Sequence, residues 1–202
     1  MATIETECDR KKEEETRKRL ADFLEILQYN FRLIKNLLQI EQSNVDQIWT
    51  QSIRYELLTR SCPDSMPYPV DLVEEVKQEC LEEMVRRLFA TGNLVSEIVD
   101  SYNRIKNSFQ ALEKIAYRLD WTLQSPLIEG SNDQFPLATT LHLGYNICLQ
   151  LESLVNEFQR AFNAIVLTES RSVDRFRLCL KIPEDFLFYV NKFLLDAQIK
   201  NE

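Results

Sequence analysis

The sequence contains few side chains that could perform acid–base chemistry, and its only histidine is the first to consider. His142 stands between Leu141 and Leu143. A histidine that acts as a general base needs a nucleophile or an orienting group within hydrogen-bond reach, and the adjacent leucines provide neither. We therefore interpret His142 as a core or rim residue of a helix.

The carboxylates are poor candidates for metal ligands or for an acid–base pair, because they occur side by side. Glu74 is followed by Glu75, and Glu82 by Glu83. Neighbours in sequence point in different directions on a helix, so these pairs indicate a solvated acidic face. A di-iron helix bundle requires Glu-x-x-His on two helices, and the residue three positions before His142 is a threonine. The sequence predicts no metal site.

The cysteines are the remaining candidates for nucleophilic chemistry. The five are Cys8, Cys62, Cys80, Cys148 and Cys179. They are widely separated, so they form no CxxC pair, and their odd number argues against a fully oxidised secreted protein. Cys80 and Cys148 fall on apolar stripes, where a thiol behaves as a small buried hydrophobe. The glycine-rich nucleotide loops and the GxSxG motif are also absent from the sequence. We predict no enzymatic activity and no cofactor.

Charge and targeting features limit the compartment and the partners. The net charge of −8 and the lack of a basic stripe disfavour direct nucleic-acid binding, which draws on clustered Lys and Arg. The first residues have no apolar core after a basic start, and their acidic side chains argue against a transit peptide. No apolar run approaches the roughly 20 residues that span a bilayer. We expect an intracellular protein, cytoplasmic or nuclear, with no membrane span.

Helical periodicity dominates the rest of the sequence. Only three glycines occur in 202 residues, which leaves few positions for the tight turns of a sheet protein. We predict an all-α fold, an elongated bundle of long antiparallel helices with coiled-coil-like heptad packing. The expected segments of this one structural domain are a charged helical extension at 1–19, a first helical segment at 20–60, a proline-rich connector at 61–71, a long helix or kinked helix pair at 72–124, a loop at 125–136, a heptad helix at 137–168 and a C-terminal helical segment at 172–202.

The heptad helix at 137–168 has the most regular pattern. Its apolar stripe keeps a four-three step and comprises Leu137, Leu141, Gly144, Cys148, Leu151, Val155, Phe158, Phe162 and Ile165. A period of 3.5 sustained over this length is typical of coiled-coil-like packing. Gly144 costs roughly 1 kcal/mol against alanine inside a helix, but it allows a partner backbone or a large ring to approach closely.

Three structural alternatives stay open at this point. Asn44 with Gln47 fits a capping box, so the first helical segment either breaks or bends there. Gly92 with Asn93 fits a C-cap followed by an N-cap, yet the apolar phase continues through them, so 72–124 is either one kinked helix or two helices. The sequence also leaves open whether the long helices pair within the chain or with another chain.

The C-terminal helix is unusually apolar. Between Phe186 and Leu195 only Asn191 and Lys192 are polar. In one interpretation the helix completes the chain's own core. The core-facing residues would then be Phe186, Val190, Phe193 and Ala197. In the other interpretation it exposes an apolar patch that binds a partner. The candidate partner interface comprises Phe186, Leu187, Phe188, Tyr189, Val190, Phe193, Leu194 and Leu195.

These features lead to two functional hypotheses. The first is a non-enzymatic structural or scaffold subunit of a multi-protein complex, which contacts other helical subunits in a hetero-oligomer through helix–helix packing. It rests on the surplus of apolar stripe, which exceeds what a simple four-helix bundle buries. The alternative is an autonomous helical-bundle adaptor that binds a partner helix or an apolar ligand in a groove. The first hypothesis predicts that the isolated chain is poorly soluble until its partner is present.

Overall fold

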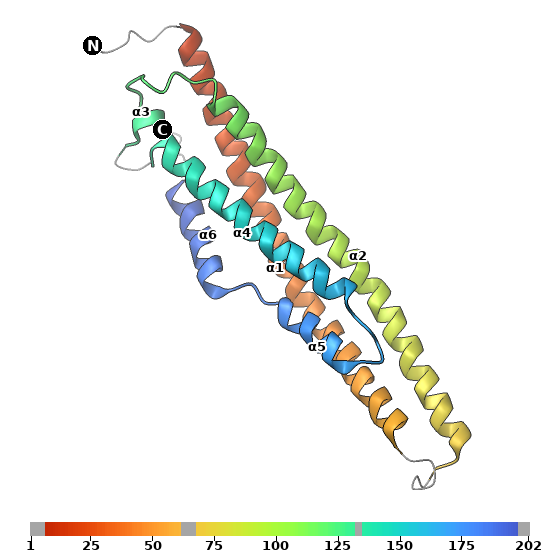
Figure 1. Ribbon diagram of the computed structural model, residues 1–202. Helices are drawn as coiled ribbons and strands as arrows, with labels where there is room; N and C mark the ends of the chain where they lie inside the picture. Colours follow the sequence, from red (N-terminus) through yellow and green to blue (C-terminus); the bar gives the residue numbers. More distant parts are fainter. Residues whose placement is uncertain (1–6, 62–67, 132–134, 198–202) are drawn as a thin grey trace. The chain divides into compact units, whose positions relative to one another are not determined.

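The all-α prediction is confirmed by a computed structural model, which describes residues 7–61, 68–131 and 135–197 (Figure 1). Within these ranges the chain forms helices and turns but no β-strand. The helices are α1 (Glu7–Arg60), α2 (Val70–Ala116), α3 (Pro126–Glu129), α4 (Leu137–Asn163), α5 (Ser170–Cys179) and α6 (Glu184–Asp196). The proline-rich connector lies between α1 and α2, and its residues 62–67 fall outside the described ranges.

Contacts divide the chain into two compact units. Unit 1 comprises Met1–Leu33, Asp100–Ser153 and Pro183–Glu202, and unit 2 comprises Ile34–Val99 and Leu154–Ile182. Helices α1, α2 and α4 each contribute one part to each unit. Unit 1 also contains α3 and α6, and unit 2 also contains α5.

Unit 1 packs segments of α1, α2, α4 and α6 around an aromatic core. The ring of Phe23 on α1 lies 5.3 Å from that of Phe109 on α2 and 6.5 Å from that of Phe193 on α6, measured between centroids. Phe31 and Phe186 meet edge to face at 5.8 Å, a favoured arrangement for aromatic pairs. Because higher residue numbers on α1 pair with lower ones on α6, these two helices run antiparallel.

Gly144 of α4 belongs to the same core. A Cβ atom built at this position would stand 2.8 Å from Cε2 of Phe109 and 3.4 Å from Cε1 of Phe23. The distance to Phe23 is an ordinary contact, whereas the distance to Phe109 is too short, so only a residue without a side chain leaves room for the Phe109 ring. The expectation that Gly144 allows a large ring to approach the helix is therefore confirmed.

The end of α2 corrects a predicted boundary. The apolar spacing predicted helix as far as residue 124, but α2 ends at Ala116 and the chain continues in turns. Leu119 and Leu123 are nevertheless buried, so the apolar spacing persists because the turn faces the same core. The predicted loop at 125–136 contains the short helix α3, whose first turn is capped by the hydroxyl of Ser125.

Unit 2 packs segments of α1, α2 and α4 with α5. Phe176 of α5 is fully buried, and its ring lies 5.0 Å from that of Phe158 and 5.6 Å from that of Phe162, both on α4. The guanidinium of Arg177 lies 4.3 Å from the centre of the Trp49 ring on α1, a cation–π contact. α5 thus joins α4 and α1 through aromatic contacts.

The end of α4 also differs from the prediction, at Asn163 instead of residue 168. The backbone N–H of Val166 donates to Oγ of Ser172 at 2.8 Å. The hydroxyl of Ser172 in turn donates to the carbonyl oxygen of Glu169 at 2.8 Å. Side-chain bonds of this kind compete with helical ones, and they turn the chain into α5.

Neither possible helix break occurs, because α1 continues through Asn44 and α2 through Gly92. Instead of capping a helix, Asn44 donates from Nδ2 to Oε1 of Glu41 at 2.8 Å and to Oγ1 of Thr91 at 3.1 Å. Its Oδ1 accepts from Nη1 of Arg87 at 3.0 Å. This polar layer pairs α1 with α2 within the chain, and its hydrogen bonds specify one register of the pair.

Candidate functional site

The structure separates the predicted interface residues of α6 into three groups. Phe186, Val190 and Phe193 are buried in unit 1 together with Ala197, so these three belong to the chain's own core and are unavailable to a partner. Three more are half-buried: Leu187, Tyr189 and Leu194. This result corrects the predicted interface, which treated all eight residues as one surface.

Phe188 and Leu195 form the outer face of α6. They are 70% and 72% exposed, and their separation of seven residues places them two turns apart on the same side of the helix. Asn191 and Lys192 lie between them and are exposed as well. We call Phe188, Asn191, Lys192 and Leu195 the α6 outer face.

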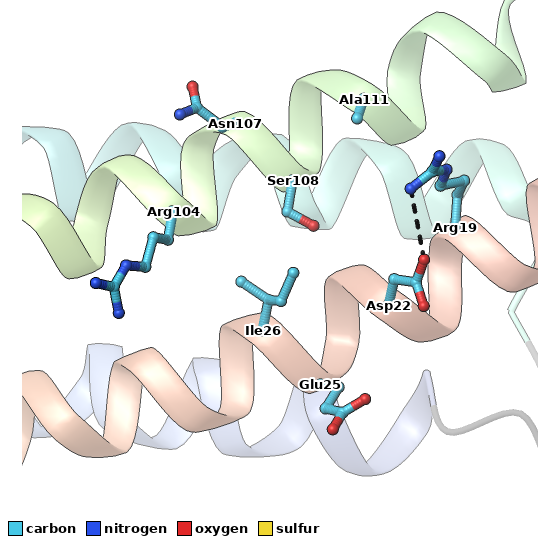
Figure 2. A pocket seen from close by; sticks show the side chains of 8 residues that line it. All are labelled: Arg19, Asp22, Glu25, Ile26, Arg104, Asn107, Ser108 and Ala111. Carbon is cyan, nitrogen blue, oxygen red and sulfur yellow. Dashed lines mark ion pairs between the residues drawn. The ribbon is translucent and has the colours of Figure 1, made fainter.

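A groove on unit 1 separates α1 from α2 (Figure 2). Its volume is about 480 Å³, and its lining residues are Arg19, Asp22, Glu25, Ile26, Arg104, Asn107, Ser108 and Ala111. Ser108 and Ala111, two small side chains, line its α2 side, and Ser108 lies across from Ile26 on α1 (Figure 2). Arg19 pairs with Asp22 across 3.6 Å. Pockets for small apolar ligands are lined mainly by apolar side chains, so this charged groove does not favour such a ligand.

A cluster in unit 1 brings four ionisable side chains together: Tyr102, Lys106, Cys148 and Glu152. Nζ of Lys106 lies 2.8 Å from Oε1 of Glu152, and this hydrogen bond is the main cause that raises the pKa of Lys106. Burial raises the pKa of Tyr102 and raises that of Cys148 to about 12. At neutral pH the lysine is therefore charged and the phenol and thiol are protonated, and none of these forms is a nucleophile.

The burial of Cys148 leads to a prediction about thiol reactivity. Cys148 is expected to react with iodoacetamide at pH 8 at least about a hundredfold more slowly than the exposed Cys8, because only the thiolate attacks and a pKa of about 12 leaves almost none. Mass-spectrometric mapping of the alkylated peptides measures both rates. In guanidinium chloride the two rates should converge, and equal rates in the native protein would contradict the buried position of Cys148.

His142 lies on the exposed side of α4, which agrees with a rim position. Its Nε2 lies 3.2 Å from Nδ2 of Asn146, one turn later.

No group of His, Cys, Asp and Glu side chains among the described residues is placed to hold a metal ion. In the same ranges, none of the helices combines the length and the apolar character needed to cross a bilayer.

Two features were not predicted from the sequence. The polar layer around Glu41 and Thr91 was missed, although Glu41 interrupts the apolar stripe between Leu38 and Val45 and could have indicated it. The groove of Figure 2 was missed because small residues such as Ser108 and Ala111 look unremarkable on a helix. Neither the polar layer nor the groove is marked by a motif in the sequence.

The fold and these surfaces define the class of protein as an all-α helical bundle with exposed apolar helix faces. No protein-family model, curated protein or solved structure matches the chain. The functional inference therefore rests on the chain's own residues.

Proposed function

We propose that this chain is a non-enzymatic structural subunit of an intracellular multi-protein complex, and that it binds another helical subunit through the α6 outer face. The observation that carries the proposal is the exposure of Phe188 and Leu195 on a helix whose opposite side is buried. Exposed apolar surface on a helix is a common mark of a protein interaction site.

The geometry of the outer face supports a helical partner. Two apolar side chains spaced by seven residues match the spacing at which a second helix presents its own ridge. Asn191 and Lys192 lie between these two side chains and supply polar groups that select a partner.

The test replaces both anchors, Phe188→Ser with Leu195→Ser, in a tagged full-length chain. Proteins that co-purify with the wild type are identified by mass spectrometry, and the stoichiometric helical partner is then co-expressed with each variant. Because exposed positions contribute little to folding, the double variant should keep its far-UV circular dichroism. It should lose at least about tenfold in affinity, since buried anchors dominate interface energy.

A matched control replaces exposed apolar residues elsewhere in unit 1. Tyr145 and Leu149 on α4 are each 51% exposed, and the variant Tyr145→Ser with Leu149→Ser should keep full binding. Unchanged binding by the α6 variant would overturn the proposal, as would a wild-type chain that is a stable, monodisperse monomer by size-exclusion chromatography with light scattering and has no stoichiometric partner. Unfolding of the α6 variant would assign Phe188 and Leu195 to the core instead.

A further inference from the structure

The α1/α2 hairpin end of unit 2 leaves its apolar residues without full cover. We define it as residues 53–61 of the α1 side and 68–79 of the α2 side, and none of these residues is buried. Its apolar side chains are Ile53, Tyr55, Leu57, Leu58, Tyr68, Val70, Leu72, Val73 and Val76. By contrast, Val45 and Ile48 earlier on α1 are fully buried. The same two helices therefore change from covered to uncovered within a few turns.

The apolar residues of the hairpin end are uncovered because α5, which packs on the preceding part of α1, does not extend along this end. The hydroxyl of Ser52 donates to the carbonyl oxygen of Leu167 at 2.7 Å, and the N–H of Ser170 donates to Glu56 at 2.5 Å. From Ser170 the helix α5 runs back along α1, since Arg177 pairs with Asp46. Two helices alone cannot enclose an apolar stripe that is wide enough for a bundle, and within residues 7–61, 68–131 and 135–197 no third helix packs on the hairpin end.

A groove marks the place where that helix would lie. Its volume is about 120 Å³, and its lining residues are Leu58, Thr59, Ser61, Tyr68, Val70, Val73, Glu74 and Lys77. Leu58 and Val73 are half-buried in it, while Tyr68 and Val70 are 63% and 57% exposed at its edge. Apolar side chains of both helices thus line the groove together with polar and charged ones, a composition that suits the apolar ridge and charged flanks of an amphipathic helix.

Charge around the groove specifies the chemistry of its occupant. The hairpin end, residues 53–61 and 68–79, carries five acidic and three basic side chains, a net charge of −2. Two of the bases are already paired: Lys77 lies 2.6 Å from Glu74, and Arg60 lies 3.2 Å from Glu56. The unpaired excess is therefore acidic, and it attracts a cationic partner and repels a second copy of this end.

We propose that the hairpin end of unit 2 binds a basic amphipathic helix of another protein. The apolar stripe of that helix fills the groove between α1 and α2, and its flanking Lys and Arg side chains pair with the acidic residues of α2. The helix completes a local three-helix arrangement and covers the apolar residues that the chain leaves open. This site does not involve α6, so it stands or falls independently of the function proposed above.

The direct test uses two synthetic helical peptides of about 20 residues, long enough for five turns. Both carry the same leucine stripe, flanked by lysines in one and by glutamates in the other. Fluorescence anisotropy with the full-length chain should show saturable one-to-one binding of the lysine peptide, at least about tenfold tighter than the glutamate peptide at ~50 mM salt. The preference should shrink at ~150 mM salt because screening increases. Equal affinities, or no saturable binding, would overturn the proposal.

Variants at the groove edge locate the site. Tyr68→Ser with Val70→Ser should weaken binding of the lysine peptide at least about tenfold, since both lose apolar contact with it. Leu178→Ser is the matched control, because Leu178 is 61% exposed on α5 of the same unit and should leave the affinity unchanged. Far-UV circular dichroism verifies that each variant folds. If the groove variant binds like the wild type, the site is wrong.

Charge variants test the choice of partner. Glu74→Lys with Glu79→Lys, both at exposed positions of the hairpin end, should reverse the preference toward the glutamate peptide. Glu14→Lys with Glu15→Lys changes the net charge equally on exposed positions of unit 1 and should leave the preference intact. If this control weakens binding as much, the attraction is only to overall charge and the proposal fails. It fails too if light scattering detects a dimer of the chain alone that the Tyr68/Val70 variant dissociates, because the occupant is then a second copy.

Discussion

Phe23→Ala is expected to lower the free energy of unfolding of unit 1 by about 3–5 kcal/mol, the usual cost of removing a fully buried phenylalanine. The ring of Phe23 is 0% exposed and contacts three helices, because it packs against Phe109, Phe193 and Gly144. Its removal leaves a cavity that none of these neighbours can fill without losing its own packing.

The two tryptophans allow this loss to be assigned to a unit. Trp121 belongs to unit 1 and Trp49 to unit 2, so Trp49→Phe leaves a fluorescence probe for unit 1 alone. Urea unfolding of Phe23→Ala in that background should give a lower midpoint at Trp121. Phe188→Ala is the control and should change stability by less than about 0.5 kcal/mol, since its side chain is exposed. Similar losses from the two substitutions would contradict the inward position of Phe23.

Local periodicity was enough to predict the helices but not their continuity. The apolar stripe of the heptad helix predicted a packed face, and its residues Leu137, Leu151 and Phe158 are buried. At Asn44 and Gly92, by contrast, the residue types fitted the end of a helix, although neither helix ends there. The outcome depended on partners far along the chain, because Asn44 bonds to Arg87 and Thr91 of α2. Such nonlocal hydrogen bonds have no counterpart in local spacing.

The candidate surfaces show the same difference between what local spacing predicts and what only tertiary packing decides. Helical spacing correctly predicted that Phe186, Val190 and Phe193 could form one face of α6, and by elimination Phe188 and Leu195 face outward. It could not predict the uncovered hairpin end, because the apolar pattern there resembles that of the covered segments. Whether Leu58 or Val73 is covered depends on where α5 lies, which is a property of tertiary packing.

Gly144→Ala is expected to destabilise unit 1 by up to about 2 kcal/mol, although alanine is the better helix former by roughly 1 kcal/mol. The new Cβ would lie 2.8 Å from Cε2 and 3.3 Å from Cδ2 of Phe109, closer than van der Waals contact allows. Phe109 is 3% exposed and is confined by Phe23, so its ring has no free space into which to move. Overpacking of this kind typically costs 1–3 kcal/mol.

Gly92→Ala provides the contrasting case on α2. A Cβ there would stand 3.4 Å from Cζ of Phe162, an ordinary contact, so the helix propensity gain of up to about 1 kcal/mol should appear as increased stability of unit 2. Urea midpoints at Trp121 and Trp49 measure the two effects separately. A double variant, Gly144→Ala with Phe109→Leu, identifies the cause: if the Phe109 ring is what the methyl meets, the two losses should be less than additive. Strict additivity would mean that Gly144 is needed for some reason other than the approach of that ring.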